Sequence, residues 1–320
     1  MAQSADAQPR SVLGAPASQV RFAEVPLEQV ARSLRGGGLL LDLGAMRLRV
    51  RSSLGMLAGA LRQVYAEFPF EPVQGFFDAD VALVRSPGLR GRLRPSLRFL
   101  ADGLDPFGPQ PWNLSLPQLE WGINWCFASL FNQHLLLHAG ALELDGTGLL
   151  LVGEPGSGKS TLTAALALAG ARLLSDEFGI LMPAERLLLP LPKPVALKNR
   201  SIDLIRGWSA EARLGPVYRK THKGDVAHLA PDRTAVDGRH APVQPSLIVF
   251  PRWQDGRAAS LEEVGAAEAF GLLAGNSFNF TTTAAEGFLA VEWLVRHCEV
   301  RRLAFGDLSE AVAVLQELCR

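Results

Sequence analysis

The sequence predicts an α/β protein in which a small amino-terminal α+β unit precedes a larger carboxyl-terminal domain. The chain has 320 residues, which exceeds the roughly 100–200 residues of one typical domain. A proline-rich segment at 105–112 divides it into two parts. The second part alternates strand-like and helix-like segments, as α/β domains do.

The first part contains short apolar segments separated by glycine and proline. Residues 1–20 are rich in Ala, Ser, Gln and Pro without periodicity, so we expect a disordered tail there. Residues 21–104 then form the small α+β domain, and a linker follows at 105–115. Within the small domain we expect helices at 27–34 and 56–67 and strands at 39–43, 46–50 and 81–85.

The second part, at 116–320, has the stronger local signals. A buried helix is predicted at 116–131, followed by a β-hairpin with strands at 135–144 and 149–152 and the turn Asp145-Gly146-Thr147-Gly148. A glycine-rich loop follows the hairpin directly, and a helix at 161–169 follows the loop. Further strands are expected at 172–175, 247–250 and 302–305, and further helices at 266–274, 287–296 and 308–318.

The composition argues against several classes of partner. Lysine plus arginine equals aspartate plus glutamate, at 32 each, so neither nucleic acid nor an anionic membrane is expected to bind. No apolar run approaches the roughly 18 residues of a membrane span, and the start lacks the form of a signal peptide, which predicts a cytoplasmic protein. Cys126, Cys298 and Cys319 are widely spaced in apolar surroundings, which favours reduced core thiols.

Lysine is rare in this chain. Only five of the 32 basic residues are lysine, and all five lie in one central stretch: Lys159, Lys193, Lys198, Lys220 and Lys223. Because lysine and arginine are not interchangeable, these positions indicate places where a compact ammonium group matters.

The glycine-rich loop matches the complete phosphate-binding pattern G-x-x-x-x-G-K-[ST]. In that pattern the glycines let backbone N–H groups surround phosphates, the lysine reaches the β and γ oxygens, and the hydroxyl binds Mg²⁺. The helix that follows adds its amino-terminal dipole. The sequence therefore predicts a site for ATP and Mg²⁺ formed by Gly153, Glu154, Pro155, Gly156, Ser157, Gly158, Lys159, Ser160 and Thr161.

An acidic pair, Asp176 and Glu177, ends the strand that follows the helix of the loop. We expect this strand beside the one that precedes the loop, which would place Asp176 at the ligand crevice. An aspartate there serves as a general base or, with Ser160, as a ligand of Mg²⁺. A motor ATPase is disfavoured, because the Leu-Ser-Gly-Gly-Gln signature is absent and the strand at 247–250 ends without an acid.

His138 and the polar segment around Lys223 each have two interpretations. A histidine on an apolar strand, such as His138, is more often a satisfied core residue than a functional group. Lys223 and His228 fit either a loop over the site or a solvated turn. Trp121 and Trp125 are expected to pack between the two parts, because no basic residues alternate with them.

Together, His138, the loop and Ser175-Asp176-Glu177 resemble the catalytic core of bacterial HPr kinase/phosphorylase. In that family a similar His-Gly stretch, a Gly-Asp-Ser-Gly-x-Gly-Lys-Ser loop and an Ala-Asp-Asp pair follow at much the same spacing. A closer resemblance is to the family called HPr kinase-related kinase A, through the segments at 120–126, 193–202 and 223–229.

The resemblance implies the P-loop fold shared by HPr kinase and phosphoenolpyruvate carboxykinase for residues 116–320. It implies that Lys159 and Ser160 hold the phosphates and Mg²⁺, and that Asp176 takes a proton from an acceptor hydroxyl. Glu177 and His138 would assist through metal, water or hydrogen-bond contacts. The candidates for contacts with the substrate or the transferred phosphoryl group are Lys198, Asn199, Lys223 and His228.

The implied activity is transfer of the γ-phosphoryl group of ATP to a serine-type hydroxyl of a protein or peptide. A homo-oligomer agrees with the resemblance, since HPr kinases themselves form hexamers. Glu154 and Glu177 stand where HPr kinases have aspartate, so the phosphorylase reaction and the substrate HPr are not part of the expectation. Two alternatives stay open: a small-molecule kinase, because the core also resembles phosphoenolpyruvate carboxykinase, and an ATP-dependent scaffold in a peptide-modification system.

Overall fold

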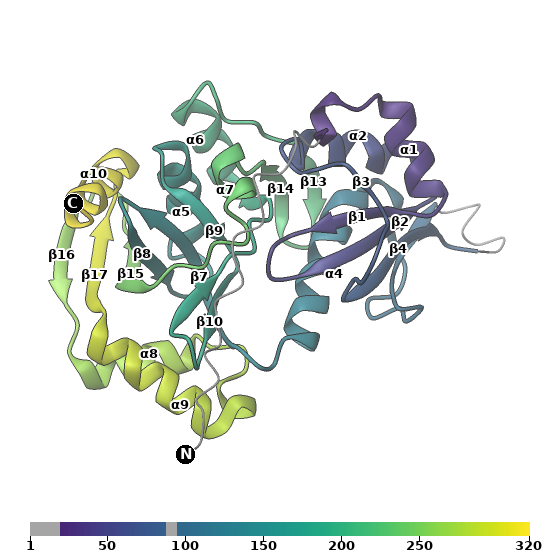
Figure 1. Cartoon of the computed structure of the whole chain (residues 1–320). Coiled ribbons are helices and arrows are strands. Elements are labelled where there is room, and N and C mark those ends of the chain that lie inside the picture. The colour runs from purple at the N-terminus through teal and green to yellow at the C-terminus, as the bar shows by residue number, and fades with distance from the viewer. Residues whose placement is uncertain (1–19, 88–94) are drawn as a thin grey trace, which may run out of the picture.

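The computed structural model describes residues 20–87 and 95–320 and has a mixed α/β fold, as predicted. Two parts lie side by side, one built on the amino-terminal sheet and one on a larger carboxyl-terminal sheet (Figure 1). Of the tail expected at 1–20, all but Val20 lies outside the described residues. Within the described ranges none of the helices combines the length and apolar character that crossing a bilayer requires.

The amino-terminal sheet has the strand order β3-β1-β2-β4-β5-β6. β2 and β4 run parallel, because α2 connects them, and the other neighbours are antiparallel. Alternate residues of β5 are buried, which is the pattern of a sheet with one solvated face. The elements are η1 (Phe22–Glu24), α1 (Leu27–Arg35), β1 (Leu39–Asp42), β2 (Arg47–Ser52), α2 (Gly55–Val64), β3 (Glu71–Pro72), β4 (Ala79–Arg85), β5 (Ser96–Ala101), β6 (Gln110–Pro111) and η2 (Trp112–Leu114).

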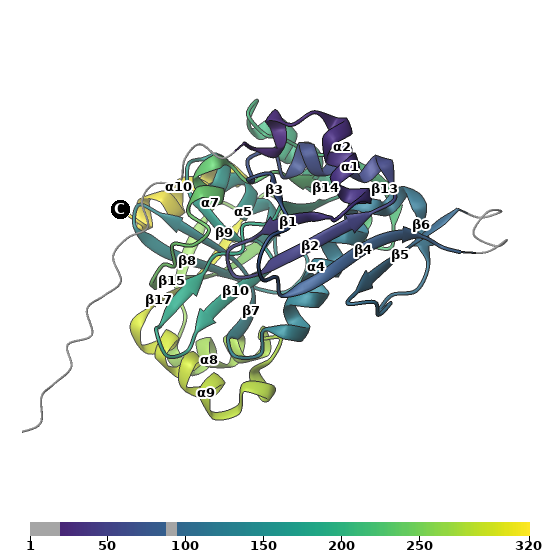
Figure 2. The same cartoon turned by 45° about the vertical axis from the view of Figure 1, so that its right-hand side comes forward.

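The helix α4 (Ser115–Leu130) lies at the junction of the two parts (Figures 1 and 2). Its residues Leu119 and Phe127 are buried in the same hydrophobic core as the amino-terminal sheet, and this core also reaches Phe178 in the larger sheet. Gly122 lets α4 approach β5 closely, because a Cβ atom there would overlap the ring of Phe99. The helix therefore belongs to both parts.

The linker predicted at 105–115 does not stand apart from the sheet. It contains β6, which pairs with β5, and η2, which contacts β5 and the later strand β13. Because α4 also shares the amino-terminal core, no stretch free of contacts separates the two parts. The division of the chain at 116 stays a prediction.

The carboxyl-terminal sheet has the strand order β11-β10-β7-β8-β15-β17-β16, and β9 also pairs with β7. β15 is parallel to both β8 and β17, whereas β7 is antiparallel to β8, β9 and β10. The strands are β7 (Leu135–Leu144), β8 (Thr147–Val152), β9 (Arg172–Ser175), β10 (Phe178–Met182), β11 (Leu187–Leu189), β15 (Pro245–Trp253), β16 (Ser260–Glu263) and β17 (Glu299–Phe305).

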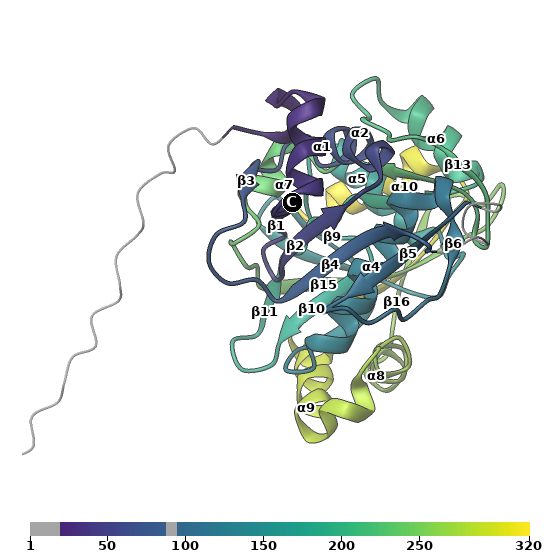
Figure 3. The ribbon, with the colours of Figure 1, turned by 90° about the vertical axis from the view of Figure 1, so that its right-hand side faces the viewer.

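Helices cover both faces of this sheet (Figures 1 and 3). α5 (Lys159–Leu168) and α10 (Leu308–Leu318) pack in the core on one face, and α8 (Ala266–Gly275) and α9 (Phe280–His297) pack on the other. α9 begins at Phe280, earlier than the helix predicted at 287–296, but it is interrupted at Ala284, whose φ of 48° and ψ of −120° are not helical. The segment after this kink contains the predicted helix. The early residues Thr281, Thr282 and Thr283 are poor helix formers, which hid this start from the sequence pattern.

Two details show how individual residues determine where the strands turn and where they end. Asp145 and Gly146 have φ angles of 49° and 82°, the left-handed pair that a two-residue type I′ turn requires between β7 and β8. The strand predicted at 247–250 continues through Pro251 to Trp253. Proline is tolerated because β8 pairs with β15 only as far as Val249, so the missing N–H interrupts no bond to β8.

A smaller sheet with the order β12-β14-β13 completes the carboxyl-terminal part. The polar segment around Lys223 is the turn of the β13–β14 hairpin. The remaining elements are β12 (Val195–Lys198), α6 (Arg200–Trp208), β13 (Tyr218–Thr221), β14 (Gly224–Leu229) and α7 (Arg233–Asp237).

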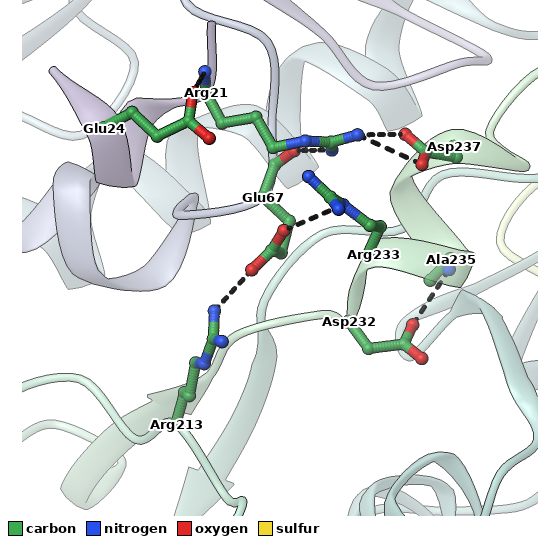
Figure 4. A network of polar contacts seen from close by, with 8 residues as sticks. All are labelled: Arg21, Glu24, Glu67, Arg213, Asp232, Arg233, Ala235 and Asp237. Carbon is green, nitrogen blue, oxygen red and sulfur yellow. Dashed lines mark hydrogen bonds and ion pairs between the residues drawn. The ribbon is translucent and has the colours of Figure 1, made fainter. Parts of the chain in front are cut away.

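Ion pairs join the two parts at the surface (Figure 4). Arg21 lies 2.9 Å from Asp237 of α7, and Glu67 accepts a hydrogen bond from Arg213 and lies 3.6 Å from Arg233. Arg21 and Glu67 belong to the amino-terminal part and the other three to the carboxyl-terminal part. Surface pairs contribute about 0–1 kcal/mol each, so these orient the parts more than they stabilise them.

A second connection is buried. Tyr65 donates a hydrogen bond to Oε1 of Glu120 at 2.6 Å, and Lys193 donates one to Oε2 at 2.8 Å. Burial raises the pKa of Tyr65 well above its ordinary value. Since Tyr65 follows α2 and Lys193 precedes β12, this polar contact links the two parts through α4.

The three cysteines are free and buried, as predicted. Burial raises the pKa of both Cys126 and Cys298 to about 12. Thiols of this kind are inert packing residues, because the reactive thiolate is not formed near neutral pH.

Two glycines test the close approach of α4 to β5. A Cβ atom at Gly122 would overlap Phe99, whereas nothing lies within 4 Å of one at Gly271 in α8. Gly122→Ala should lower the free energy of unfolding by about 1–3 kcal/mol through overpacking. Gly271→Ala, the matched control, should raise it by about 0.5–1 kcal/mol, because alanine favours helix. Urea unfolding measures both, and a neutral Gly122→Ala would contradict the packing described.

Candidate functional site

The glycine-rich loop connects the buried strand β8 to α5. Gly156 and Gly158 have φ angles of 93° and 94°, a region that other residues rarely adopt. Residues 154–156 are exposed, and the first N–H groups of α5 have no partner within the helix. Free N–H groups and the helix dipole make this a favourable place for an anion.

Lys159 is the first residue of α5 and is only 6% exposed. Its Nζ lies 3.3 Å from Nε2 of His138. Burial lowers the pKa of Lys159, while the charges of Asp176 and Glu177 act to raise it. A desolvated ammonium group of this kind interacts strongly with an anion that replaces water.

His138 lies on β7, where its backbone N–H donates to the carbonyl of Asn276 at 2.7 Å. Its ring contacts the ring of Phe278, and its Nε2 lies 3.9 Å from Oε1 of Glu177. Burial lowers the pKa of His138, and the charge of Lys159 lowers it further. The ring is therefore neutral near pH 7, and because an ammonium group can only donate, Nε2 accepts the hydrogen bond from Lys159.

Asp176 follows β9, is 7% exposed, and has no hydrogen-bond partner for Oδ1. Burial raises the pKa of Asp176 to about 6, and the charge of Glu177 adds to the increase. The charges of Lys159 and Lys193 and a hydrogen bond from Ser160 act in the opposite direction. A carboxyl group with this pKa is mostly ionised at neutral pH and still takes up a proton readily, as a general base must.

The prediction that β9 lies beside β8 is wrong, because β7 lies between them. β7 pairs with β8 on one side, and on the other side it pairs first with β10 and then with β9. Since β7 is antiparallel to both β8 and β9, those two strands run in the same direction and end at the same edge of the sheet. The loop and Asp176 therefore meet at that edge, although a strand separates β8 from β9.

Asp176 and Glu177 fill the gap between β9 and β10. Ser175 pairs with Ala141 and Phe178 pairs with His138, so neither acid takes part in the ladder with β7. The interruption places the Glu177 carboxylate next to the side chain of His138, which lies on β7.

Two further lysines lie near His138. Lys198 ends β12, and Lys223 lies in the turn of the β13–β14 hairpin. The charges of both lower the pKa of His138. Burial and the charge of Lys198 lower the pKa of Lys223, while the charge of Glu177 raises it. The fold thus gathers three ammonium groups from distant parts of the chain around one acidic pair.

The β13–β14 hairpin is held from two sides. Lys223 lies 5.5 Å from the centre of the Trp121 ring of α4, and His222 meets the same ring at 4.3 Å. The backbone N–H of Asn199 donates to the carbonyl of Asp225 at 2.9 Å, and its Oδ1 accepts the N–H of Asp225 at 3.0 Å. The Asn199 side chain therefore braces the hairpin, and its contact with a substrate stays a prediction.

His228 does not lie in a loop over the site, which corrects the expectation from the sequence. It is part of β14, is fully buried, and has no partner for either ring nitrogen. Burial lowers the pKa of His228 to about 4. β14 is the central strand of its sheet and contributes a run of four buried residues at its end, so the polar segment stops before His228.

The residues available to a metal ion are few. Among the residues that the structure describes, no group of three or more His, Cys, Asp or Glu side chains is placed to hold a metal. Ser160 and Asp176 lie close enough for a side-chain hydrogen bond. A set of one hydroxyl and one carboxylate suits Mg²⁺, which proteins commonly bind together with substrate phosphates.

The sequence analysis did not select Phe278 or Lys193. Phe278 lies in the connection between α8 and α9, and no local pattern predicts its contact with His138. Lys193 did have a signal, the clustering of all lysines in one central stretch. The charges of four of the five, Lys159, Lys193, Lys198 and Lys223, act on the pKa of His138 or Asp176.

No known protein family matches the chain, and no curated protein is significantly similar to it. The geometry of Lys159, His138, Asp176 and Glu177 is therefore the main basis for a function.

Asp176→Asn should make the ligand-free protein more stable at about pH 8. The folded-state pKa of about 6 exceeds the ordinary value of 3.8, so stability falls as the pH rises between these values. Asparagine carries no charge, so the variant avoids the loss of about 3 kcal/mol in the free energy of unfolding that follows from raising the pKa from 3.8 to about 6. In calorimetry the variant should melt above wild type at about pH 8 and equal it at about pH 4. A lower melting temperature at the higher pH would contradict the raised pKa.

Proposed function

We propose that this protein is a kinase that uses ATP and Mg²⁺ to phosphorylate a serine-type hydroxyl of a protein or peptide. We also propose that its carboxyl-terminal part has the P-loop fold of HPr kinase and phosphoenolpyruvate carboxykinase. One observation carries the proposal: the lysine of a complete phosphate-binding motif lies 3.3 Å from His138, at the sheet edge that also bears the buried Asp176. A phosphate cradle beside a carboxyl group of raised pKa is the arrangement that transfer to a hydroxyl requires.

The transfer step balances as a single displacement. The acceptor hydroxyl gives its proton to the carboxylate of Asp176 while its oxygen forms a bond to the γ-phosphorus. The bond from the γ-phosphorus to the β–γ bridging oxygen breaks, and ADP leaves. Asp176 is ionised at neutral pH because its pKa of about 6 lies below that pH.

The loop and Lys159 hold the phosphates. Backbone N–H groups of the loop and of the start of α5 bind phosphate oxygens, and Lys159 binds the β and γ oxygens. Mg²⁺, when bound, neutralises charge on the phosphates, and Ser160 and Asp176 would hold it. The unpartnered Oδ1 of Asp176 supports this role, since it leaves one carboxylate oxygen without a protein hydrogen bond.

Lys198 and Lys223 supply further positive charge near His138. The transferred phosphoryl group spreads negative charge over its oxygens, and fixed cations in a desolvated site stabilise it. Because Trp121 and Asn199 hold the hairpin, Lys223 is in position before a substrate arrives. Neutral His138 keeps Lys159 in place by accepting its hydrogen bond.

Labelled ATP tests the proposal. Incubated with Mg²⁺ and a cell lysate, the protein should transfer label to a polypeptide that electrophoresis detects. Asp176→Asn should slow transfer about 10²- to 10⁴-fold, because it removes the base, while the affinity for ATP without Mg²⁺ changes little in calorimetry. Lys159→Ala should weaken both transfer and binding.

The control is Asp203→Asn, whose side chain on α6 is 80% exposed, and it should behave as wild type. Unchanged transfer by Asp176→Asn would overturn the proposed base. Label found only in a small molecule would favour a metabolite kinase instead. Partner capture that needs ATP but consumes none would favour a scaffold.

A further inference from the structure

A cavity of about 420 Å³ opens beside the glycine-rich loop. It lies between the ends of β15 and β17, one side of α6, and the start of α10. The side chains that matter for its chemistry are Thr161, Arg200, Leu204, Trp208, Trp253 and Phe305. Nothing in the proposed transfer step uses this cavity.

The cavity and the acidic pair lie on opposite sides of the loop. Across the sheet the order is β7, β8, β15 and β17, with β9 paired to the far side of β7. Asp176 follows β9, the loop follows β8, and Trp253 and Phe305 end β15 and β17. A ligand whose phosphates occupy the loop therefore has its reacting end toward Asp176 and its other end toward the cavity.

The cavity is joined firmly to the loop. The backbone N–H of Trp253 donates to the carbonyl of Ser157 at 3.1 Å. A Cβ atom at Gly158 would lie 3.0 Å from the ring of Phe305 and 3.4 Å from Cβ of Trp253. The loop thus rests on the same two aromatic residues that line the cavity, so the distance between the two sites is fixed.

The walls suit a flat, uncharged ring. Trp253 is 43% exposed, so part of its indole ring is accessible to a planar group. The guanidinium group of Arg200 lies over the same ring, 6.0 Å from its centre, and adds a cation–π contact at the edge of the cavity. The hydroxyls of Thr161 and Ser201 are 2.7 Å apart and engage each other. Oδ1 of Asp307 accepts N–H groups at the start of α10. Apart from Arg200, the wall therefore offers mainly apolar contact and stacking.

We propose that this cavity, the base pocket, holds the aromatic base of the phosphoryl donor, with Trp253 as the stacking partner. The donor is then a nucleoside triphosphate bound by its base as well as its phosphates, rather than pyrophosphate or a polyphosphate chain. This inference rests on the proposed function, because it needs a phosphate chain on the loop.

Calorimetry with ADP and with inorganic pyrophosphate, each with Mg²⁺, tests the base pocket. Wild type should bind ADP at least about 10-fold more tightly than pyrophosphate, because a stacked base adds affinity. Trp253→Ala should weaken ADP binding about 10-fold or more and leave pyrophosphate binding unchanged, and Trp253→Phe should keep most of the ADP affinity. Trp125→Ala, at a 37% exposed tryptophan of α4, should bind both ligands as wild type does.

The outcomes separate the two proposals. Equal affinity of wild type for ADP and pyrophosphate would overturn the base pocket and leave the loop as a phosphate site. An equal loss of both ligands in Trp253→Ala, at an unchanged melting temperature, would overturn it too. Failure of folded wild type to bind either ligand would instead overturn the proposed kinase, and the base pocket with it.

Discussion

The pairing of β7 with three other strands is the constraint on which the candidate site depends. Through β8 this strand positions the glycine-rich loop, through β9 and β10 it positions the acidic pair, and it carries His138 itself. The ladder hydrogen bonds of one strand thus set the spacing of the glycine-rich loop, the acidic pair and His138. Sites built on strands hold their geometry more closely than sites built on loops. The connections between these elements supply the acidic pair, the backbone N–H groups of the glycine-rich loop and Lys223.

At this edge of the carboxyl-terminal sheet, buried charged groups lie in an electrostatically unfavourable environment. Burial raises the pKa of Asp176 and lowers the pKa of Lys159, so each charged form costs free energy in the absence of a ligand. Oγ of Ser157 and Oδ1 of Asp176 are buried without partners, whereas most buried polar atoms in proteins are hydrogen-bonded. Proteins break such rules mainly at functional sites. A ligand with phosphates and a metal ion would satisfy these groups, which is consistent with a site prepared for occupancy.

Local chemistry made much of the fold predictable. The Asp145-Gly146 turn, the loop after a buried strand and the alanine-rich α5 are determined by neighbouring residues, and the structure has all three. The neighbours of β9, the sharing of α4 between two cores and the contact of Phe278 with His138 depend on residues far apart in the sequence. Periodicity carries no information on such pairings. His228 illustrates the limit, since a polar residue next to a turn was compatible with exposure until the order of strands was known.

The position of α4 has a mechanical consequence. One side of the helix is buried with the amino-terminal sheet through Leu119 and Phe127, and Trp121 touches the hairpin that carries Lys223. Close-packed protein interiors have low compressibility and transmit strain. A displacement of the amino-terminal sheet would therefore be transmitted through α4 to the β13–β14 hairpin. The amino-terminal sheet and Lys223 are far apart in the sequence, but a single helix, α4, contacts both the core of that sheet and the Lys223 side chain.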